Sequence, residues 1–474
     1  MAENNQGQAG HRRLPLLVAL TPIVAMMALL IVGYGVYHIV PQVLLIGAAL
    51  ITGVLGLILR CPWEEMQKGI VESIHKALPA MLIMICVGIL IGSWIAAGTI
   101  PMIIYYGLQL ISPKVFLATA CLVCSLTSLA TGTSWGTIGT LGVAFMGIAS
   151  AQGIPPGAAA GAIVAGAYFG DKMSPFSDVT NLAPAVAASN LFDHIKHMMY
   201  SAVPAWLLGF VVYLLVGLRY SAAAAESETT TLIMETLRQH FHFNVLLLLP
   251  LVVVFYFAAA KKPVLPGMLF SALIAGALAV IFQGASVPDV AQAMDTGFKS
   301  ATGVAAVDKL ISRGGMMSMM GVQLVAFTAF SFGGIMQRIG LLQVIFDHLK
   351  RFTERVGSLV LTTVGTAVLT ALVTGSSYLS MIVPGELFAP VYRQRNLAAK
   401  NLSRLIEECG AIVVPLIPWS MAGVYVTGTI GVSPFQYFPW AVQNYAAVFI
   451  LIAFGFTGLT MAPKVRDDET QVGS

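Results

Sequence analysis

The chain has 474 residues, of which 57% are hydrophobic and only 10% are charged, and its mean hydropathy is +0.85. Soluble domains carry roughly a quarter charged residues, so this composition excludes an ordinary soluble protein. The net charge of +4 is too small to indicate a nucleic-acid partner, and we expect none.

Apolar runs follow one another along the whole chain. A membrane helix needs about 20 apolar residues, and continuous runs cover residues 14–36, 41–59, 78–97, 198–218, 243–260, 265–282, 316–336, 359–373 and 440–459. Other runs are interrupted by Gly, Pro, Ser and Asp. We therefore expect an all-α polytopic membrane protein with roughly ten to thirteen crossings, some of them broken or re-entrant.

The runs divide the chain into five parts. The first run follows Arg12 and Arg13, is too long for a signal peptide and lacks a small-residue cleavage site, so we interpret it as a membrane helix. The division gives a cytoplasmic N-terminal tail (1–13), a first membrane half (14–218), a polar connector (219–242), a second membrane half (243–460) and a C-terminal tail (461–474).

The first polar segment within the apolar region is S-L-T-S-L-A-T-G-T-S-W-G-T (125–137). Glycine allows a helix to break, and the freed carbonyls with the hydroxyls of Thr131, Thr133 and Ser134 are oxygen ligands that suit a small cation. The alternative is that these small residues only let helices pack closely. Upstream, Cys121 and Cys124 share one helix face and are typical of reduced core cysteines.

A second polar segment, G-D-K-M-S-P-F-S-D-V-T-N (170–181), follows an apolar helix and is broken by a proline. Ionised groups are costly in the bilayer, so they face a cavity, pair with one another or lie in an interfacial loop. We favour a cavity, with Lys172 neutralising one of two aspartates. The candidate ligands are Asp171, Ser177, Asp178, Thr180 and Asn181. Further on, His194 and His197 favour a polar helix entrance over a metal site.

The second half repeats both segments. T-G-T-S-W (131–135) is echoed by T-G-S-S-Y (374–378), and P-F-S (175–177) by P-W-S (418–420), each 243 residues later. The echo adds Ser376 and Ser377 to the candidate site. Glu407 and Glu408 are further candidates, although a surface ion pair with Arg404 explains them equally well. Glu386 is either functional or interfacial.

The two halves are expected to be inverted relative to one another. Gly92 and Gly98 match Gly334 and Gly340 at an offset of 242. Few basic residues follow Gly98, whereas several follow Gly340, so the positive-inside tendency places the two helix ends on opposite sides. The loop 284–315 is also basic and weakens this contrast. An inverted repeat is a transporter architecture, with the site near the midplane where the halves meet.

The chain resembles the NhaC family of sodium–proton antiporters, which includes the malate/lactate antiporter. The resemblance is carried by T-G-T-S-W-G-T-I-G-T (131–140), G-A-Y-F-G-D-K-M-S-P-F-S-D-V-T-N-L-A-P (166–184), N-L-S-R-L-I-E-E-C-G (401–410) and P-L-I-P-W (415–419). It implies a secondary transporter of the cytoplasmic membrane that exchanges Na⁺ for protons, in some members with an organic acid. The second half departs from the family pattern at Ser376, Ser377 and Glu386, which leaves the transported solute open.

The expected mechanism is alternating access around a carboxylate, Asp178 or Asp171, that binds Na⁺ or a proton but not both. Asp178, Thr133 and Ser134 are the expected Na⁺ ligands. The alternative is Na⁺- or H⁺-coupled transport of a small organic anion or amino acid. No ATP-binding or hydrolase motif is present, so we expect neither an enzyme nor a cofactor, and transport must be driven by a gradient. We expect the protein in the cell membrane, with its N-terminus in the cytoplasm. A homodimer is compatible with this expectation.

Overall fold

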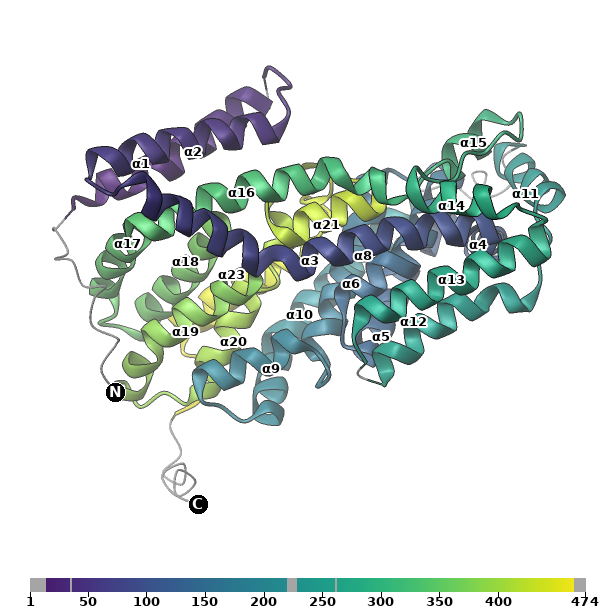
Figure 1. The fold of residues 1–474 in the computed structure, drawn as a ribbon. Helices are drawn as coiled ribbons and strands as arrows, with labels where there is room; N and C mark the ends of the chain where they lie inside the picture. The colour runs from purple at the N-terminus through teal and green to yellow at the C-terminus, as the bar shows by residue number, and fades with distance from the viewer. Residues whose placement is uncertain (1–13, 35, 220–227, 261, 464–474) are drawn as a thin grey trace.

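The computed structural model describes residues 14–34, 36–219, 228–260 and 262–463. The predicted N-terminal tail and most of the C-terminal tail lie outside this range. Helices make up most of the described chain, many of them lying side by side (Figure 1). The predicted all-α fold is confirmed.

Nine helical stretches of the described chain are long and apolar enough to cross a membrane. They are Leu16–Tyr34, Pro41–Ile58, Trp63–Ala97, Pro113–Thr131, Ser134–Ala151, Leu191–Gly217, Val264–Gln283, Met316–Ile339 and Val356–Thr374. Two bent pairs, Glu228–His240 with Val245–Ala259 and Ala399–Leu416 with Met421–Ile430, raise the number to 11 if each counts as one span. The protein is a multi-pass membrane protein.

The first half contains ten α-helices in chain order: α1 (Leu16–Ala28), α2 (Pro41–Ile58), α3 (Trp63–Ala97), α4 (Thr99–Leu110), α5 (Pro113–Thr131), α6 (Ser134–Thr137), α7 (Val143–Ala151), α8 (Pro156–Met173), α9 (Asp178–Ala187) and α10 (Leu191–Gly217). Proline at the first helical position starts α2, α5 and α8, where its missing N–H would have no partner in any case.

The chain continues with α11 (Glu228–His240), α12 (Leu249–Ala259), α13 (Val264–Gln283), α14 (Val287–Asp295), α15 (Ala305–Ile311), α16 (Met320–Ile339), α17 (Leu341–Leu349), α18 (Val356–Thr374), α19 (Ser377–Gln394), α20 (Ala399–Gly410), α21 (Met421–Ile430), α22 (Pro434–Tyr437) and α23 (Val442–Thr457). Helix α11 occupies much of the segment that the sequence suggested as a polar connector.

The repeat is visible in the local geometry of both halves. Helices α5 and α18 each end at a left-handed glycine, Gly132 with φ +70° and Gly375 with φ +62°. The residue after each glycine caps the next helix: the Thr133 side chain accepts from the Gly136 N–H, and the Ser376 side chain accepts from the Leu379 N–H. These equivalent caps follow from the 243-residue offset.

Two repeat-related helices, α3 and α16, cross at glycines and run antiparallel (Figure 1). Gly69, near the start of α3, touches Gly334, near the end of α16. Gly88, near the end of α3, touches Gly315, just before α16. Antiparallel packing of equivalent helices is what an inverted repeat requires, while the inversion of the two complete halves stays a prediction.

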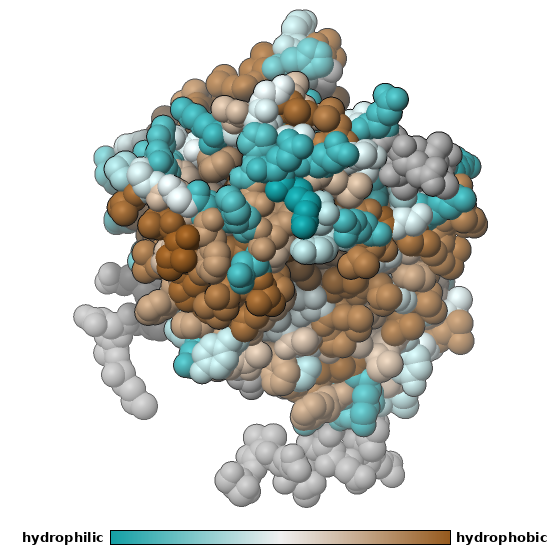
Figure 2. All heavy atoms as spheres, turned by 90° about the vertical axis from the view of Figure 1, so that its right-hand side faces the viewer, coloured by the Kyte–Doolittle hydropathy of each residue, from teal (hydrophilic) through white to brown (hydrophobic). Residues whose placement is uncertain are grey.

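The outer surface of the helices is largely apolar. Helix α13 exposes Leu269, Phe270, Leu273 and Ile281. Figure 2 shows polar residues gathered over the upper middle of one end of the molecule and apolar residues over much of the rest of that end. Because lipid tails face such apolar surfaces without cost, this distribution is typical of a protein surrounded by a bilayer.

Candidate functional site

The candidate site is built around two breaks in the first half. One lies between α5 and α6, at Gly132, and the other between α8 and α9, where the Ser177 side chain accepts from the Thr180 N–H. The Asn181 side chain also donates to the carbonyls of Pro175 and Ser177, at 2.9 and 2.6 Å. These bonds replace the helical partners that the break removes.

The two breaks touch one another. A Cβ atom on Gly132 would lie 2.7 Å from the carbonyl carbon of Phe176 and 2.9 Å from the Ser177 nitrogen. The same contact occurs in the second half, where a Cβ on Gly375 would lie 3.1 Å from the Cα of Ser420. Glycine is therefore required at position 132 for its left-handed conformation and for the close approach of two chain segments.

A cavity of about 780 Å³ opens beside the first-half breaks. Its wall combines residues of both halves, and seven of the predicted site residues line it: Thr131, Thr133, Ser134, Asp171, Asp178, Asn181 and Ser377. The other five, Ser177, Thr180, Ser376, Glu407 and Glu408, are buried and lie outside the lining. The structure thus brings most of the predicted residues to one place.

Asp171 is the buried acid of the cavity. Its Oδ2 accepts a hydrogen bond of 2.7 Å from the Ser134 hydroxyl. Within the described residues, no group donates to its Oδ1, and the hydroxyl of Tyr168, another cavity residue, is also unpartnered. A buried carboxylate oxygen without a partner is unfavourable unless a proton or a cation occupies its free side.

Asp178 has a different environment in the same cavity. It is exposed, at the start of α9, and the hydroxyl of Tyr378 donates to its Oδ2. Tyr378 is the repeat counterpart of Trp135 and belongs to the second half. Asp178 therefore connects the halves at the cavity wall, whereas Asp171 lies deeper.

The expected arrangement of the Na⁺ ligands differs in detail from the structure. Ser134 donates to Asp171 rather than to Asp178, and the Thr133 hydroxyl is occupied as a helix cap. Lys172 was expected to neutralise one aspartate, but it pairs with Glu408 of the second half, at 3.4 Å. The reason is that Lys172 lies near the end of α8, where its side chain is buried against α20.

Glu407 and Glu408 are fully buried, so the surface ion-pair interpretation of them is wrong. Glu408 accepts from Lys172 and, at 3.1 Å, from the Ser201 hydroxyl. Glu407 accepts from the Thr180 hydroxyl at 2.9 Å and lies 2.6 Å from His194. Glu386, by contrast, is exposed and away from the cavity, as an interfacial residue would be.

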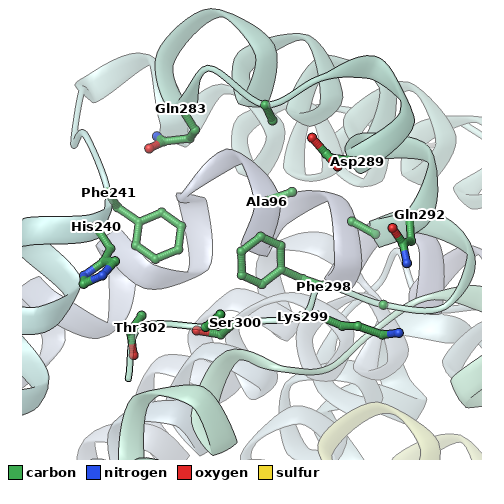
Figure 3. A pocket seen from close by; sticks show the side chains of 14 residues that line it. Ala96, His240, Phe241, Gln283, Asp289, Gln292, Phe298, Lys299, Ser300 and Thr302 are labelled. Atoms are coloured by element: carbon green, nitrogen blue, oxygen red, sulfur yellow. The ribbon is translucent and has the colours of Figure 1, made fainter. Parts of the chain in front are cut away.

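A second, smaller cavity of about 360 Å³ lies at the end of α3 (Figure 3). The rings of Phe241 and Phe298 line it, with Gln283 and Asp289 on one side and Lys299 on another. It contains none of the predicted site residues and belongs to the region around α14 and the loop 296–304.

The family of the chain follows from comparison with known proteins. Residues 166–459 match the profile of the Na⁺/H⁺ antiporter family. The chain belongs to the Na⁺/H⁺ antiporter family. Membership of this family indicates a transporter, and the matched region includes the break between α8 and α9 and the buried Glu407 and Glu408.

Relatives of this antiporter match it over almost its whole length. An uncharacterised Na⁺/H⁺ antiporter of Haemophilus influenzae is 42% identical and covers 95% of this chain and 98% of its own. The Na⁺/H⁺ antiporter NhaC of Alkalihalophilus pseudofirmus is 36% identical, covering 92% and 94%. The malate-2H⁺/Na⁺-lactate antiporter of Bacillus subtilis is 34% identical, covering 94% and 96%.

Several residues in or next to the cavity of the antiporter were missed by sequence reasoning. Trp135 stacks on Tyr425 of α21 with ring centroids 4.2 Å apart, and the Tyr425 hydroxyl donates to the Trp135 carbonyl at 2.5 Å. Lys76 and Lys262 also line the cavity. The repeat could have indicated Tyr378, but nothing in the sequence near Tyr425, Lys76 or Lys262 marks them.

Proposed function

We propose that the protein exchanges Na⁺ for protons at the cavity between its halves, with Asp171 as the carboxylate that binds either ion. The observation that carries this proposal is the buried Oδ1 of Asp171, which no group of the described chain satisfies. A proton on Asp171 removes a negative ligand from the site, so Na⁺ and the proton compete. Competition of this kind gives exchange without a separate coupling device.

The oxygen atoms around Asp171 suit a small hard cation. The hydroxyls of Ser134 and Tyr168 and the carbonyls freed at the broken helices are of the type that Na⁺ accepts. Asp178, at the exposed part of the cavity, attracts cations toward the site. Hydration water can complete the coordination, since the cavity is far larger than one ion.

Alternating access requires one half to move against the other around this site. Contacts between the halves beside the cavity include Tyr378 with Asp178, Trp135 with Tyr425, and Lys172 with Glu408. The close packing of α3 and α16 at their glycines is a further contact between the repeats.

The proposal is tested with purified protein in liposomes that contain a pH-sensitive dye. Addition of Na⁺ outside is expected to change the internal pH, and the response should be absent with choline in place of Na⁺. A response of equal size with both salts would contradict Na⁺/H⁺ exchange.

A second candidate function is coupled transport of a small organic anion. The cavity volume of about 780 Å³ lies in the range of small-molecule sites. Part of its wall is apolar, with Trp135, Ile412 and Met421, and Lys76 and Lys262 supply positive charge without a carboxylate partner in the described chain. The Bacillus subtilis relative is named a malate-2H⁺/Na⁺-lactate antiporter.

The same liposomes separate the two candidates. Malate, lactate and amino acids are added in turn together with Na⁺. A dye response that requires one of these solutes supports the second candidate, whereas a full response with NaCl alone supports Na⁺/H⁺ exchange.

A further inference from the structure

A buried histidine lies next to the candidate site, outside the cavity lining. His194, near the start of α10, and Glu407, on α20, are both fully buried. The Nε2 atom of His194 is 2.6 Å from the Oε2 atom of Glu407, and its Nδ1 atom is 2.9 Å from the Ser403 hydroxyl. A contact of 2.6 Å between these two atoms requires a hydrogen between them.

The Ser403 hydroxyl allows two protonation states of this pair. It has one hydrogen, and it has two acceptors within reach: the Lys400 carbonyl at 3.2 Å and the Nδ1 atom of His194. If the hydroxyl donates to Nδ1, the imidazole is neutral and its Nε2–H donates to Glu407. If it donates to Lys400, Nδ1 must carry a proton of its own, and the His194–Glu407 pair then holds one proton more than in the first state.

Moving between these states adds one proton at Nδ1 and rotates one hydroxyl group. No side chain has to leave its place, and every polar atom of the pair keeps a partner in both states. In a buried pair without such a hydroxyl, a change of protonation leaves a donor or an acceptor unsatisfied, which is costly.

A hydroxyl joins the pair to the cavity. The Thr180 side chain donates at 2.9 Å to Oε1 of Glu407, and it also lies 3.2 Å from the backbone carbonyl of Asp171. Glu407 thus contacts His194 through one carboxylate oxygen and Thr180 through the other, and Thr180 lies beside Asp171. His194, Glu407, Thr180 and Asp171 therefore form one connected network. A proton on His194 and a cation or proton on Asp171 both change the charge of this network.

The buried charges of this network do not balance without an added cation. Asp171, Glu407 and Glu408 are acids, whereas Lys172 and Arg404 are the two bases, all of them buried. The missing positive charge is supplied by Na⁺ at Asp171, by a proton on Asp171 or by a proton on His194. An uncompensated buried charge is strongly unfavourable, so the network favours one added positive charge.

We infer that His194, paired with Glu407, is a second proton-binding site of the transporter, and that Na⁺ entering the cavity drives the proton off His194. A proton on His194 keeps the network neutral while Asp171 stays ionised and ready for Na⁺. This inference rests on the proposed Na⁺/H⁺ exchange, and it adds a group that holds the exchanged proton.

The titratable and charged groups around His194 come from few elements. Helices α5 and α23 bring no charged side chain close to His194. Lys114 of α5 lies at the far end of α10, beside Gly217, and α23 has no charged residue. The acidic, basic and histidine side chains on α10 itself and on α8, α9 and α20 are Asp193, Lys196, His197, Asp171, Lys172, Asp178, Lys400, Arg404, Glu407 and Glu408, and the same helices also carry Tyr168, Tyr200, Tyr213 and Cys409. The charge count above includes every buried carboxylate, ammonium and guanidinium group of this set. Asp178 is left out because it is exposed.

The proton site is tested without Na⁺ by ¹⁵N-histidine NMR of the protein in lipid nanodiscs in choline buffer, with His194→Gln identifying the His194 signals. We expect both ring nitrogens of His194 to be protonated at low pH and Nδ1 alone to lose its proton as the pH is raised. A His194 ring whose protonation does not change with pH overturns the inference.

The coupling is tested by repeating the titration with Na⁺ in place of choline. Na⁺ should lower the pH of half-protonation of His194 by about one unit or more, and Asp171→Asn should remove this shift. No shift in a protein that exchanges Na⁺ in liposomes overturns the inference and leaves the proposed function intact. A normal His194 titration in a protein without Na⁺ exchange overturns the proposed function instead.

A transport measurement completes the test. His194→Gln keeps a donor and an acceptor near Glu407 and Ser403 but cannot take up a proton, so the pH at which exchange is half-maximal should shift by about one unit or more. The control is His197→Gln, one turn along α10, whose ring contacts Asn401 and not the network. Equal pH profiles of His194→Gln and the wild type would contradict a proton on His194.

Discussion

At the scale of single residues, the two aspartates of the cavity have different tasks. Asp171 is buried with an unsatisfied oxygen, whereas Asp178 is exposed and held by Tyr378. The sequence offered both as equivalent candidates, because their spacing says nothing about depth. The difference arises from the break between α8 and α9, which places Asp171 inside α8 and Asp178 at the first position of α9.

Asp171→Asn is expected to abolish Na⁺-dependent exchange, because a neutral amide can neither bind the proton nor neutralise Na⁺. Asp178→Asn should weaken the apparent Na⁺ affinity and leave exchange measurable. The liposome dye assay reads both. Asp193→Asn, on an exposed part of α10, is the control and should behave as the wild type. Full activity of Asp171→Asn would remove Asp171 from the mechanism.

The Lys172–Glu408 pair is expected to hold the two halves together. Both side chains are fully buried, 3.4 Å apart. Replacing one partner, as in Lys172→Met, leaves a buried carboxylate uncompensated and should cost about 3–5 kcal/mol of stability. Thermal unfolding in detergent, followed by tryptophan fluorescence, measures the loss. The double variant Lys172→Met with Glu408→Gln should recover part of it, and a double variant that is no better than the single one would contradict the charge argument.

At the scale of elements, the breaks decide where chemistry can occur. The repeated glycine, serine and proline motifs predicted both breaks, because left-handed glycine and helix caps are local properties of the sequence. The contacts of Tyr425 with Trp135 and of His194 with Glu407 join residues more than 200 positions apart. Such contacts depend on how whole helices pack, and no local pattern indicates them.

Gly132→Ala is expected to damage the site more than Gly153→Ala. Both glycines are left-handed, with φ +70° and +67°, so each alanine pays about 1–2 kcal/mol for that conformation. Only at Gly132 does the new Cβ meet another chain segment, at 2.7 Å from Phe176, whereas nothing lies within 4 Å at Gly153. Thermal unfolding and the dye assay compare them. Equal effects would show that the contact between the two breaks is unimportant.

The loop beside α15 depends on one carboxylate. The Ser300 hydroxyl, at 2.6 Å, and the Thr302 N–H and hydroxyl, both at 2.8 Å, donate to Asp308 and hold its pKa below the usual value. A lowered pKa means that the carboxylate stabilises the loop above the ordinary carboxyl range and loses this effect as pH falls through the lowered pKa.

Hydrogen exchange of residues 298–304 in nanodiscs should therefore show protection at neutral pH that decreases in acid. Asp308→Asn should reduce the protection at neutral pH, whereas Asp295→Asn, an exposed residue of α14, should not. A loop equally protected in Asp308→Asn and wild type would contradict this assignment.

At the scale of the whole molecule, a duplicated frame holds an unequal distribution of charge. Both halves contain the same breaks and caps, but Asp171 belongs to the first half and its buried companions Glu407 and Glu408 to the second. The duplication and the membrane fold could be predicted from composition and from the constant 243-residue offset. The pairing of Lys172 with Glu408 could not, because it requires the relative placement of the halves.

The central claim is that this antiporter exchanges Na⁺ for protons at Asp171. The most direct test is uptake of ²²Na⁺ into liposomes with an acidic interior, with the membrane potential clamped by potassium and valinomycin. The account predicts uptake that follows the imposed pH gradient, stops when the gradient is collapsed and is absent in Asp171→Asn. Uptake that is indifferent to the pH gradient, or unchanged in Asp171→Asn, would contradict it.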